Sequence, residues 1–437
     1  MISFADQLSE LHSFRLAKFD LGSGFVYAHY AGRSILNIPD SICELFGVPT
    51  LSNRPLAEGI LPEASSGEQL QNVILIVVDA LALHRLQRWM DDGTAPVWNE
   101  LAYNWPKPAT FSPLTSITPS TTAAALTSLW TGRSSAEHGI TGYEMWMKEY
   151  GVVANTILHA PMNFRDEVGT LAKAGFDPKK YLQSGSSSFP TLGEHLAAHD
   201  VSTFVLQHRS ILRSGLSQMF FQDLSTQGFH NASDLWINLR HLLENQRYQR
   251  TYTYVYWSEV DSFGHRYGPD DERTVAEFSS FSQSFEHLFL AKLSQEARQN
   301  TLLILTADHG QITTQKDDHY RVQNHPNLWR RLHIQPTGEN RLAFLYVRPG
   351  QMEAVSELVD RTWKNQFIQI DPVYAVENGL FGPGEPHPAL LDRVGDTILL
   401  ARERAYLWWG NIDNHLIGRH GGLHPEEMLV PLLAVRL

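Results

Sequence analysis

Residues 73–79 read VILIVVD, a run of aliphatic and β-branched side chains that stops at the carboxylate of Asp79. Two later runs are similar and also stop at a carboxylate or just past one: YTYVYWSEVD (252–261) and TLLILTADH (301–309). Such runs are typical of buried strands in a parallel sheet. Ligands of open α/β sheets gather at the carboxyl ends of the strands, so we expect these three ends to form one rim. They carry Asp79, Asp261, Asp308 and His309.

Segments with helical spacing of apolar residues lie between these runs. They include LALHRLQRWMDDG (81–93), TLGEHLAAHD (191–200), SDLWINLRHLLENQ (233–246) and SSFSQSFEHLFLAKLSQEARQ (279–299). Alternation of strand and helix predicts an α/β fold with a doubly wound, mostly parallel sheet flanked by helices.

A chain of 437 residues exceeds the usual size of a single core, so we expect more than one unit. We interpret residues 1–70 as an N-terminal extension, within which 55–68 has the composition of a linker. Residues 71–320 and 410–437 form the predicted α/β core. The strand and helix rhythm changes over 321–409, which we predict to be a smaller α+β insert that caps the core.

Composition excludes several classes of protein. Hydrophobic residues make up 43% and charged residues 19%, an ordinary globular balance, and the formal charge of −12 argues against nucleic-acid duplexes or anionic membranes as partners. A site for an anionic substrate must then obtain its positive potential locally, for example from metal ions. Cys43 is the sole cysteine, which rules out an internal disulfide and a thiolate zinc cluster.

The chain has no apolar stretch of membrane-spanning length, and its first twenty residues carry acidic side chains where a signal peptide needs an apolar core. We therefore predict a cytoplasmic protein. An extracytoplasmic protein whose signal segment has been removed is the alternative. The sequence does not indicate an oligomeric state.

Two pairs of residues have metal-ligand character. Asp261 and His265 stand four apart in DSFGH, where the glycine would let the chain fold back in a tight turn. Asp308 and His309 are adjacent, and at a strand end that turns into Gly310 both can face one pocket. A single Asp-His pair is usually surface turn chemistry. Several pairs at strand ends, together with His420 and Thr122, have the chemistry of a two-metal phosphoryl-transfer site.

Thr122 lies in PSTTAAALTSL, where Pro119 and Ser120 are helix start signals and the alanines favour helix. Its hydroxyl would fall in the first turn, where unpaired N–H groups and the helix dipole favour a phosphate. The alternative is that Thr121 or Thr122 merely caps the helix.

Together these segments resemble the alkaline phosphatase superfamily and, within it, the type I phosphodiesterase and nucleotide pyrophosphatase family. Five motifs in the family's order carry the resemblance: VVDA (77–80), PSTTAAALTSLWTGRSSAEHGI (119–140), DSFGHRYGP (261–269), TADHG (306–310) and RHGG (419–422). They cover the core from about residue 72 to 310 and from about 415 to the end.

The resemblance implies two zinc ions, with manganese as the alternative. One would be held by Asp261, His265 and His420, and the other by Asp79, Asp308, His309 and the Thr122 oxygen. Thr122 rather than Thr121 matches the family's nucleophile, because it stands ten residues before Gly132.

One position departs from the family's pattern. Where nucleotide pyrophosphatases have an asparagine that donates to a phosphoryl oxygen, GITGYEMW has Tyr143. Its hydroxyl could make the same bond, or its ring could pack under the cap. Among the other histidines, His138 is expected to support a helix end, and His424 is the main rival of His420 as a ligand.

The predicted function is hydrolysis of phosphodiester or nucleotide pyrophosphate bonds through a phospho-threonine intermediate. The expected partner is a small-molecule phosphoester, of which a nucleotide is one candidate. The alternatives are a phosphomonoesterase or phosphonate hydrolase on the same metals, and a non-catalytic phosphoester-binding protein.

Overall fold

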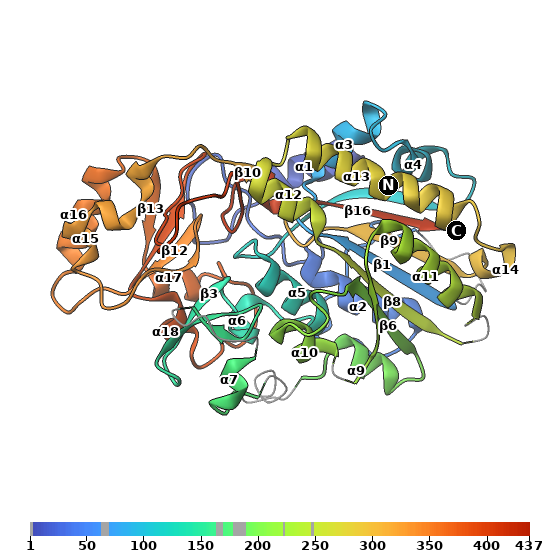
Figure 1. The fold of residues 1–437 in the computed structure, drawn as a ribbon, viewed down its shortest axis with the longest axis horizontal. Coiled ribbons are helices and arrows are strands. Elements are labelled where there is room, and N and C mark those ends of the chain that lie inside the picture. The colour runs from blue at the N-terminus through green and yellow to red at the C-terminus, as the bar shows by residue number, and fades with distance from the viewer. Residues whose placement is uncertain (1–2, 63–69, 163–168, 178–188, 222, 246–248) are drawn as a thin grey trace.

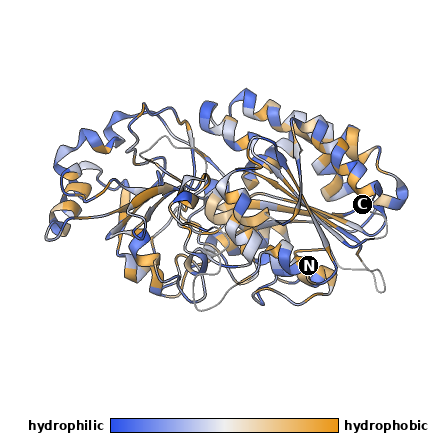
Figure 2. Ribbon diagram, turned by 60° about the horizontal axis from the view of Figure 1, so that its bottom comes forward, coloured by the Kyte–Doolittle hydropathy of each residue, from blue (hydrophilic) through white to orange (hydrophobic). Residues whose placement is uncertain are grey.

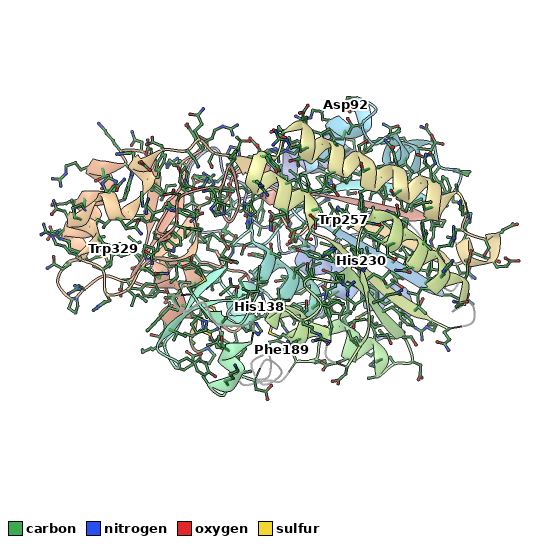
Figure 3. All side chains as sticks on the ribbon, viewed as in Figure 1. Asp92, His138, Phe189, His230, Trp257 and Trp329 are labelled. Atoms are coloured by element: carbon green, nitrogen blue, oxygen red, sulfur yellow. The ribbon has the colours of Figure 1, made fainter. Side chains whose placement is uncertain are left out.

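The protein has two lobes that meet along a central seam (Figure 1). The computed structural model describes residues 3–62, 70–162, 169–177, 189–221, 223–245 and 249–437. The larger lobe contains a twisted sheet covered by helices on both faces, and the smaller lobe contains a second sheet. Trp329 lies in the smaller lobe, far from Trp257 in the larger one (Figure 3).

The larger sheet has the strand order β2-β16-β9-β1-β8-β6-β7 within the described residues. Its strands are β1 (Asn72–Val78), β2 (Ala109–Thr115), β6 (Ser202–His208), β7 (Ser225–Phe229), β8 (Thr251–Trp257), β9 (Thr301–Thr306) and β16 (Leu429–Arg436). Neighbours from β9 to β7 pair in parallel, whereas β16 is antiparallel to both β9 and β2. The predicted fold class, a mostly parallel doubly wound sheet, is therefore confirmed.

The register of the three central strands aligns their carboxyl ends. Val78 of β1 pairs with Trp257 of β8, and Val77 pairs with Thr306 of β9. All residues of these strands are buried, as expected for aliphatic and aromatic runs covered on both faces. The segments that follow them, which begin at Asp79, Ser258 and Ala307, consequently emerge at one rim.

Helices cover the larger sheet in two layers (Figure 1). One layer comprises α3 (Leu83–Asp91), α4 (Pro96–Asn99), α11 (Ala232–Asn245), α12 (Glu259–Tyr267) and α13 (Glu272–Ser284). The other comprises α2 (Ile38–Phe46), α5 (Thr122–Thr131), α9 (Leu192–Ala197) and α10 (Gly215–Phe221). Figure 2 shows apolar strands at the centre and helices on which apolar and polar residues alternate, the pattern of helices with one buried face.

The smaller lobe is built around a sheet of order β13-β14-β12-β11-β3-β4-β5 in the part of the chain that the structure describes. Its strands are β3 (Glu144–Met147), β4 (Val152–Asn155), β5 (Ala160–Pro161), β11 (Thr337–Glu339), β12 (Leu342–Leu345), β13 (Phe367–Ile370) and β14 (Thr397–Ala401). Its helices include α15 (Pro326–Trp329), α16 (Met352–Thr362), α17 (Pro372–Glu377) and α18 (Leu390–Val394). The lobe therefore combines residues 144–161 with the segment 321–409 that we predicted as an insert.

The N-terminal segment folds against the core. Helix α1 (Phe4–Ser13) contacts β2, and α2 packs on α5. Buried Asp40 of α2 accepts hydrogen bonds from the main-chain N–H groups of Leu51, Ser52 and Arg54, which fixes the path of the chain that follows. The predicted linker 55–68 lies partly outside the described residues, which stop at 62 and resume at 70.

Two sequence-based expectations about elements are corrected. The run 252–261 is not one strand, because β8 ends at Trp257 and α12 begins at Glu259. The predicted long helix 279–299 is divided between α13, a wider helical turn over Phe285–Leu290, and the short helix α14 (Gln295–Arg298).

Candidate active site

Asp79 and Asp308 meet at the rim of the large sheet. Asp79 follows β1 directly, and the chain then turns through Ala80 in the left-handed region at φ +61°. The main-chain N–H of Ala80 donates to Oδ1 of Asp308 over 3.2 Å, which ties the ends of β1 and β9 together. The hydroxyl of buried Tyr256 on β8 donates to Oδ2 of Asp79.

His309 joins this pair to Thr122. Its Nε2 atom lies 3.4 Å from Oδ1 of Asp79, 3.6 Å from Oδ2 of Asp308 and 3.1 Å from the hydroxyl oxygen of Thr122. The side chains of the adjacent residues Asp308 and His309 thus lie close together.

Asp261 and His265 lie on one face of α12, one helical turn apart. This corrects the predicted tight turn, because spacing of four residues in a helix brings both side chains together without a reversal of the chain. Nε2 of His265 is 3.2 Å from Oδ2 of Asp261 and 3.2 Å from Nε2 of His420. Nε2 of His420 is 3.8 Å from Oδ1 of Asp261.

The three histidines share one hydrogen-bonding arrangement. In each, Nδ1 contacts a main-chain carbonyl: Gly418 for His265 at 2.8 Å, Gly310 for His309 at 2.9 Å, and Ser120 for His420 at 3.2 Å. A carbonyl only accepts, so Nδ1 carries the proton and donates, and the Nε2 lone pair is left for another partner. This is the arrangement by which proteins orient histidine ligands of metals.

The charges in the site are unfavourable unless a cation is present. Burial, with the neighbouring Asp308 and Asp261 carboxylates, raises the pKa of Asp79 well above its usual value, and burial also raises that of Asp308. Burial and the neighbouring His309 and His265 lower the pKa of His420. Among the described residues, Oδ1 of Asp79 and Oδ2 of Asp308 are buried and accept no hydrogen bond. Unpaired oxygens beside free nitrogen lone pairs fit a metal site.

Two sets of donor atoms lie close enough to hold ions. One consists of Asp261, His265 and His420, and the other of Asp79, Asp261 and His309, each with donor atoms within 4.8 Å of one another. Asp261 belongs to both sets, whereas the family resemblance had implied it for one ion alone. Asp308 stands beside the second set through its contact with His309.

Thr122 is the first residue of α5, and neither threonine caps the helix through its side chain. Thr121 occupies the N-cap position without a side-chain capping bond, since its hydroxyl donates to Oε1 of Glu339 at 2.6 Å. The hydroxyl of Thr122 contacts His309 instead. The capping alternative therefore does not account for either side chain.

A buried ion pair between the two lobes supports the loop that follows His420. Arg341 of the smaller lobe donates to Glu427 at 2.8 Å, and both side chains are fully buried. Oε1 of Glu427 also accepts from the main-chain N–H of Gly422, two residues after His420. His424 accepts from the main-chain N–H of Glu426 and caps the helix α19 (Pro425–Met428).

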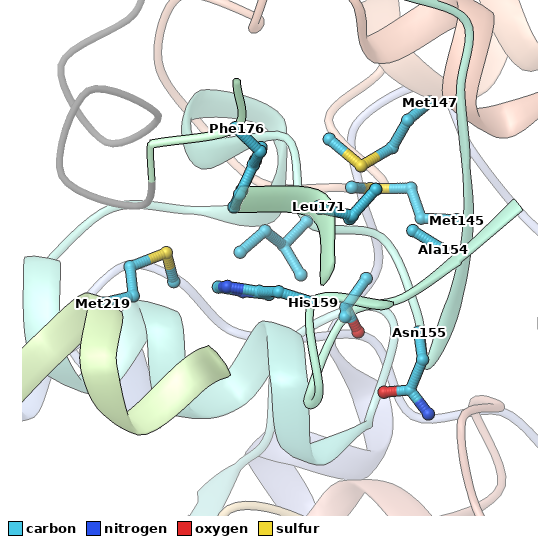
Figure 4. Close-up of a pocket in the computed structure, with 10 residues that line it drawn as sticks. Met145, Met147, Ala154, Asn155, His159, Leu171, Phe176 and Met219 are labelled. Atoms are coloured by element: carbon cyan, nitrogen blue, oxygen red, sulfur yellow. The ribbon is translucent and has the colours of Figure 1, made fainter. Parts of the chain in front are cut away.

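Tyr143 reaches the site through its main chain. Its N–H donates to Oε1 of Glu339 at 2.7 Å, and its side chain is 39% exposed. Burial raises the pKa of the Tyr143 hydroxyl, and a hydrogen bond with the Asn155 side chain opposes the shift. Asn155 also lines a small apolar cavity in which His159 and Met219 lie at one end and Met145 and Met147 at the other (Figure 4).

Sequence reasoning missed three residues that support the site: Tyr256, Gln311 and Glu339. Gln311 donates to Oδ1 of Asp261 at 2.8 Å and packs against Gly264, where a Cβ would lie 1.9 Å from its Oε1 atom. In the sequence, the one signal for Gln311 was its position directly after the TADHG motif. His138, which we expected to support a helix end, is buried at the end of α6 (Ser135–His138) (Figure 3). Its ring contacts the Ser128 hydroxyl.

The model of one protein family, type I phosphodiesterase / nucleotide pyrophosphatase, matches residues 73–423. The chain belongs to this family. The match spans the rim, α5, α12 and the lobe with β11, and ends just past His420. Family members are metal-dependent phosphodiesterase and pyrophosphatase hydrolases, so this protein is an enzyme of that class.

Solved structures of two ectonucleotide pyrophosphatases / phosphodiesterases and of a phosphonoacetate hydrolase share the fold. Murine ectonucleotide pyrophosphatase / phosphodiesterase 5 is 16% identical, with a TM-score of 0.56 over 83% of this chain and 88% of that one. Phosphonoacetate hydrolase from Sinorhizobium meliloti 1021, in complex with phosphonoformate, is 18% identical, with a TM-score of 0.56 over 84% and 90%. The human ectonucleotide pyrophosphatase / phosphodiesterase 5 is 14% identical, with a TM-score of 0.55 over 83% and 87%. An inactive variant of the murine protein has been solved in complex with AMP.

No helix of the described residues is long and apolar enough to cross a membrane.

Proposed function

We propose that this enzyme hydrolyses phosphodiester or nucleotide pyrophosphate bonds at a two-zinc site through a phospho-threonine intermediate on Thr122. The observation that supports the proposal most is the 3.1 Å separation between the Thr122 hydroxyl and Nε2 of His309. It brings a nucleophile to the edge of a set of metal-type donors, which a protein that only binds phosphoesters does not need.

The donor atoms suit zinc. One ion would be held by Asp261, His265 and His420, and the other by Asp79, Asp308, His309 and the Thr122 oxygen. Mixed carboxylate and imidazole ligands are typical of zinc, and manganese is the alternative. When bound, the ions would act as Lewis acids that lower the pKa of the threonine hydroxyl and neutralise phosphoryl charge.

The reaction of the protein's own groups has two steps. The Thr122 oxygen attacks phosphorus, a phosphothreonine forms, and the leaving alcohol or phosphate departs. Water then hydrolyses the phosphothreonine, which releases the product and restores the hydroxyl. The N-terminus of α5 directs free N–H groups and the positive end of its dipole at the phosphoryl oxygens through both steps.

The first two basic residues that follow Thr122 in the sequence are engaged elsewhere, which favours a diester over a monoester. Arg133 pairs with Glu137 at 3.2 Å, and Lys148 pairs with Asp392 at 2.9 Å. A monoester dianion usually requires an added cation beside the metals, whereas a diester carries one charge. The AMP complex of the inactive murine relative supports a nucleotide as the substrate class.

The test combines metal analysis with turnover of bis-nitrophenyl phosphate. We expect about two zinc ions per chain, loss of turnover after chelation, and recovery when zinc is restored. A protein that contains magnesium or calcium alone and remains active in chelator would contradict the zinc mechanism.

The cytoplasmic location expected from the sequence stays a prediction, which cell fractionation tests.

A further inference from the structure

Strand β11 of the smaller lobe enters between two loops of the active site. Gly338 packs so closely on Gly142 that a Cβ at residue 142 would lie 2.7 Å from the Gly338 Cα atom. Gly421 has φ +107°, and a Cβ there would lie 2.3 Å from the Cβ atom of Glu339. Glycines at 142 and 421 therefore allow the main chain of β11 to reach the loops that carry Tyr143 and His420.

Glu339 is the residue that β11 brings into this gap. Its Oε1 atom accepts from the Thr121 hydroxyl at 2.6 Å and from the Tyr143 N–H at 2.7 Å. The two donors come from the start of α5 and from the loop before β3. One carboxyl oxygen from the smaller lobe thus connects both segments.

Such a carboxyl is costly to bury. Glu339 is 9% exposed, and burial raises its pKa to about 8, although the hydrogen bonds from Thr121 and Tyr143 oppose the shift. An apolar side chain would fill the same space without this desolvation penalty. The hydrogen bonds that the Glu339 carboxyl accepts therefore explain its presence better than packing does.

The contact with Glu339 lies at the start of α5. Thr121 has extended backbone angles, φ −142° and ψ 145°, and Thr122 begins the helix directly after it. Because the Thr121 hydroxyl is directed to Glu339 and makes no capping bond, the orientation of residue 121 is set from the smaller lobe. A rotation there would displace the Thr122 hydroxyl from its place 3.1 Å from His309.

We infer that Glu339 is a positioning residue for the nucleophile: through the Thr121 hydroxyl and the Tyr143 main chain, it fixes Thr122 in the geometry of attack. The inference rests on the proposed role of Thr122. It assigns to the smaller lobe a part in the chemical step.

The experiment is a double-mutant cycle on bis-nitrophenyl phosphate with the zinc-loaded full chain. Glu339→Ala should lower kcat by about thirtyfold or more and leave KM within about threefold, because misplacement of a reacting group acts on the chemical step. Thr121→Val should lower kcat by about tenfold. The double variant should lose no more than Glu339→Ala alone, because both changes break the same contact. Glu339→Gln keeps an acceptor oxygen and should stay within about fivefold of the parent.

Glu144 offers a matched control. It is a half-buried carboxyl on β3 that accepts from Trp409 at 2.9 Å and from Gln335 at 3.0 Å within the smaller lobe. Glu144→Ala should keep kcat within about threefold of the parent. Equal losses of kcat for Glu144→Ala and Glu339→Ala would mean that both residues only stabilise the fold, and would overturn the inference. Additive losses of kcat in the double-mutant cycle would also overturn it.

Two further outcomes are distinguishable. If Glu339→Ala does not fold, Thr121→Val carries the test, because it removes only a hydroxyl, and an unchanged kcat would overturn the inference. If Thr122→Ala keeps full activity, the proposed nucleophile itself is wrong. If Thr122→Ala is inactive while Glu339→Ala and Thr121→Val match the parent, the role of Glu339 alone is wrong.

Discussion

The hydroxyl oxygen of Thr122 lies 3.1 Å from Nε2 of His309, although the two residues are 187 positions apart in the chain. Helix α5 supplies the first, and the loop that follows β9 supplies the second. The contact connects the helix start, with its free N–H groups, to the rim of carboxylates and imidazoles.

Replacement of Thr122 by alanine should lower kcat by at least about a thousandfold, because it removes the nucleophile of a covalent mechanism. Thr122→Ser keeps a hydroxyl and should retain part of the activity. The control is Thr121→Ala, for which we expect a loss of about tenfold. Steady-state kinetics on bis-nitrophenyl phosphate measures all three, and equal losses at 121 and 122 would refute the assignment.

His420 and His424 should differ strongly. His420→Ala removes a nitrogen 3.2 Å from that of His265 and should reduce activity by about a hundredfold through lost metal affinity. His424→Ala should cost about 1 kcal/mol of stability as a lost helix cap and much less activity. Zinc content, activity and thermal unfolding distinguish the two effects. A larger activity loss at 424 would move the ligand there.

Diesters should be hydrolysed faster than monoesters of the same leaving group. Arg133 and Lys148 are paired with acidic residues, and Tyr143 offers at most a neutral hydroxyl to the phosphoryl group. The measurement is kcat/KM for bis-nitrophenyl phosphate against nitrophenyl phosphate, with Tyr143→Phe alongside. A monoester preference of about tenfold or more would overturn the diesterase proposal. Unchanged kinetics of Tyr143→Phe would limit that side chain to packing.

Acid should destabilise the fold partly through His159. Burial lowers the pKa of this histidine from 6.5 to about 4, so the unfolded chain binds a proton there at pH 5 and the folded protein does not. The contribution of neutral His159 to the free energy of unfolding is up to about 3 kcal/mol. It is fully present above about pH 6.5 and is lost as pH falls towards 4.

The check is urea unfolding in chelator at pH 4.5 to 7.5, with His159→Asn as the comparison. Asparagine tolerates the left-handed backbone of residue 159, at φ +52°, and does not titrate. The variant should show a smaller fall in unfolding free energy on acidification. Parallel curves would exclude a contribution from His159.

Local sequence signals predicted those parts of the fold that depend on neighbouring residues. The aliphatic run 73–79 predicted β1, and the alanines after Thr122 predicted α5. Asp261 was assigned to a strand end because the aromatic run before it masks the start of α12. Ser258, at the N-cap of that helix, makes no side-chain capping bond and so gave only a weak signal.

Long-range contacts could not be predicted in this way. Glu339 bonds to Thr121 across 218 positions, and Tyr256 bonds to Asp79 across 177, so no motif joins either pair. The antiparallel placement of β16 between β9 and β2 likewise depends on the tertiary fold. The position of Tyr143 in the family pattern was visible, but its shared acceptor Glu339 was not.

The pairing of Gly338 on β11 with Glu144 on β3 has a consequence for the assembly of the chain. The second sheet cannot be completed until segments almost two hundred residues apart have been synthesised, and closure of such a long loop is slow. A fragment limited to 321–409 would expose the edge of β11, and open edges invite aggregation. A chimera designed to exchange substrate preference must therefore transfer the hairpin of residues 144–155 together with the later segment.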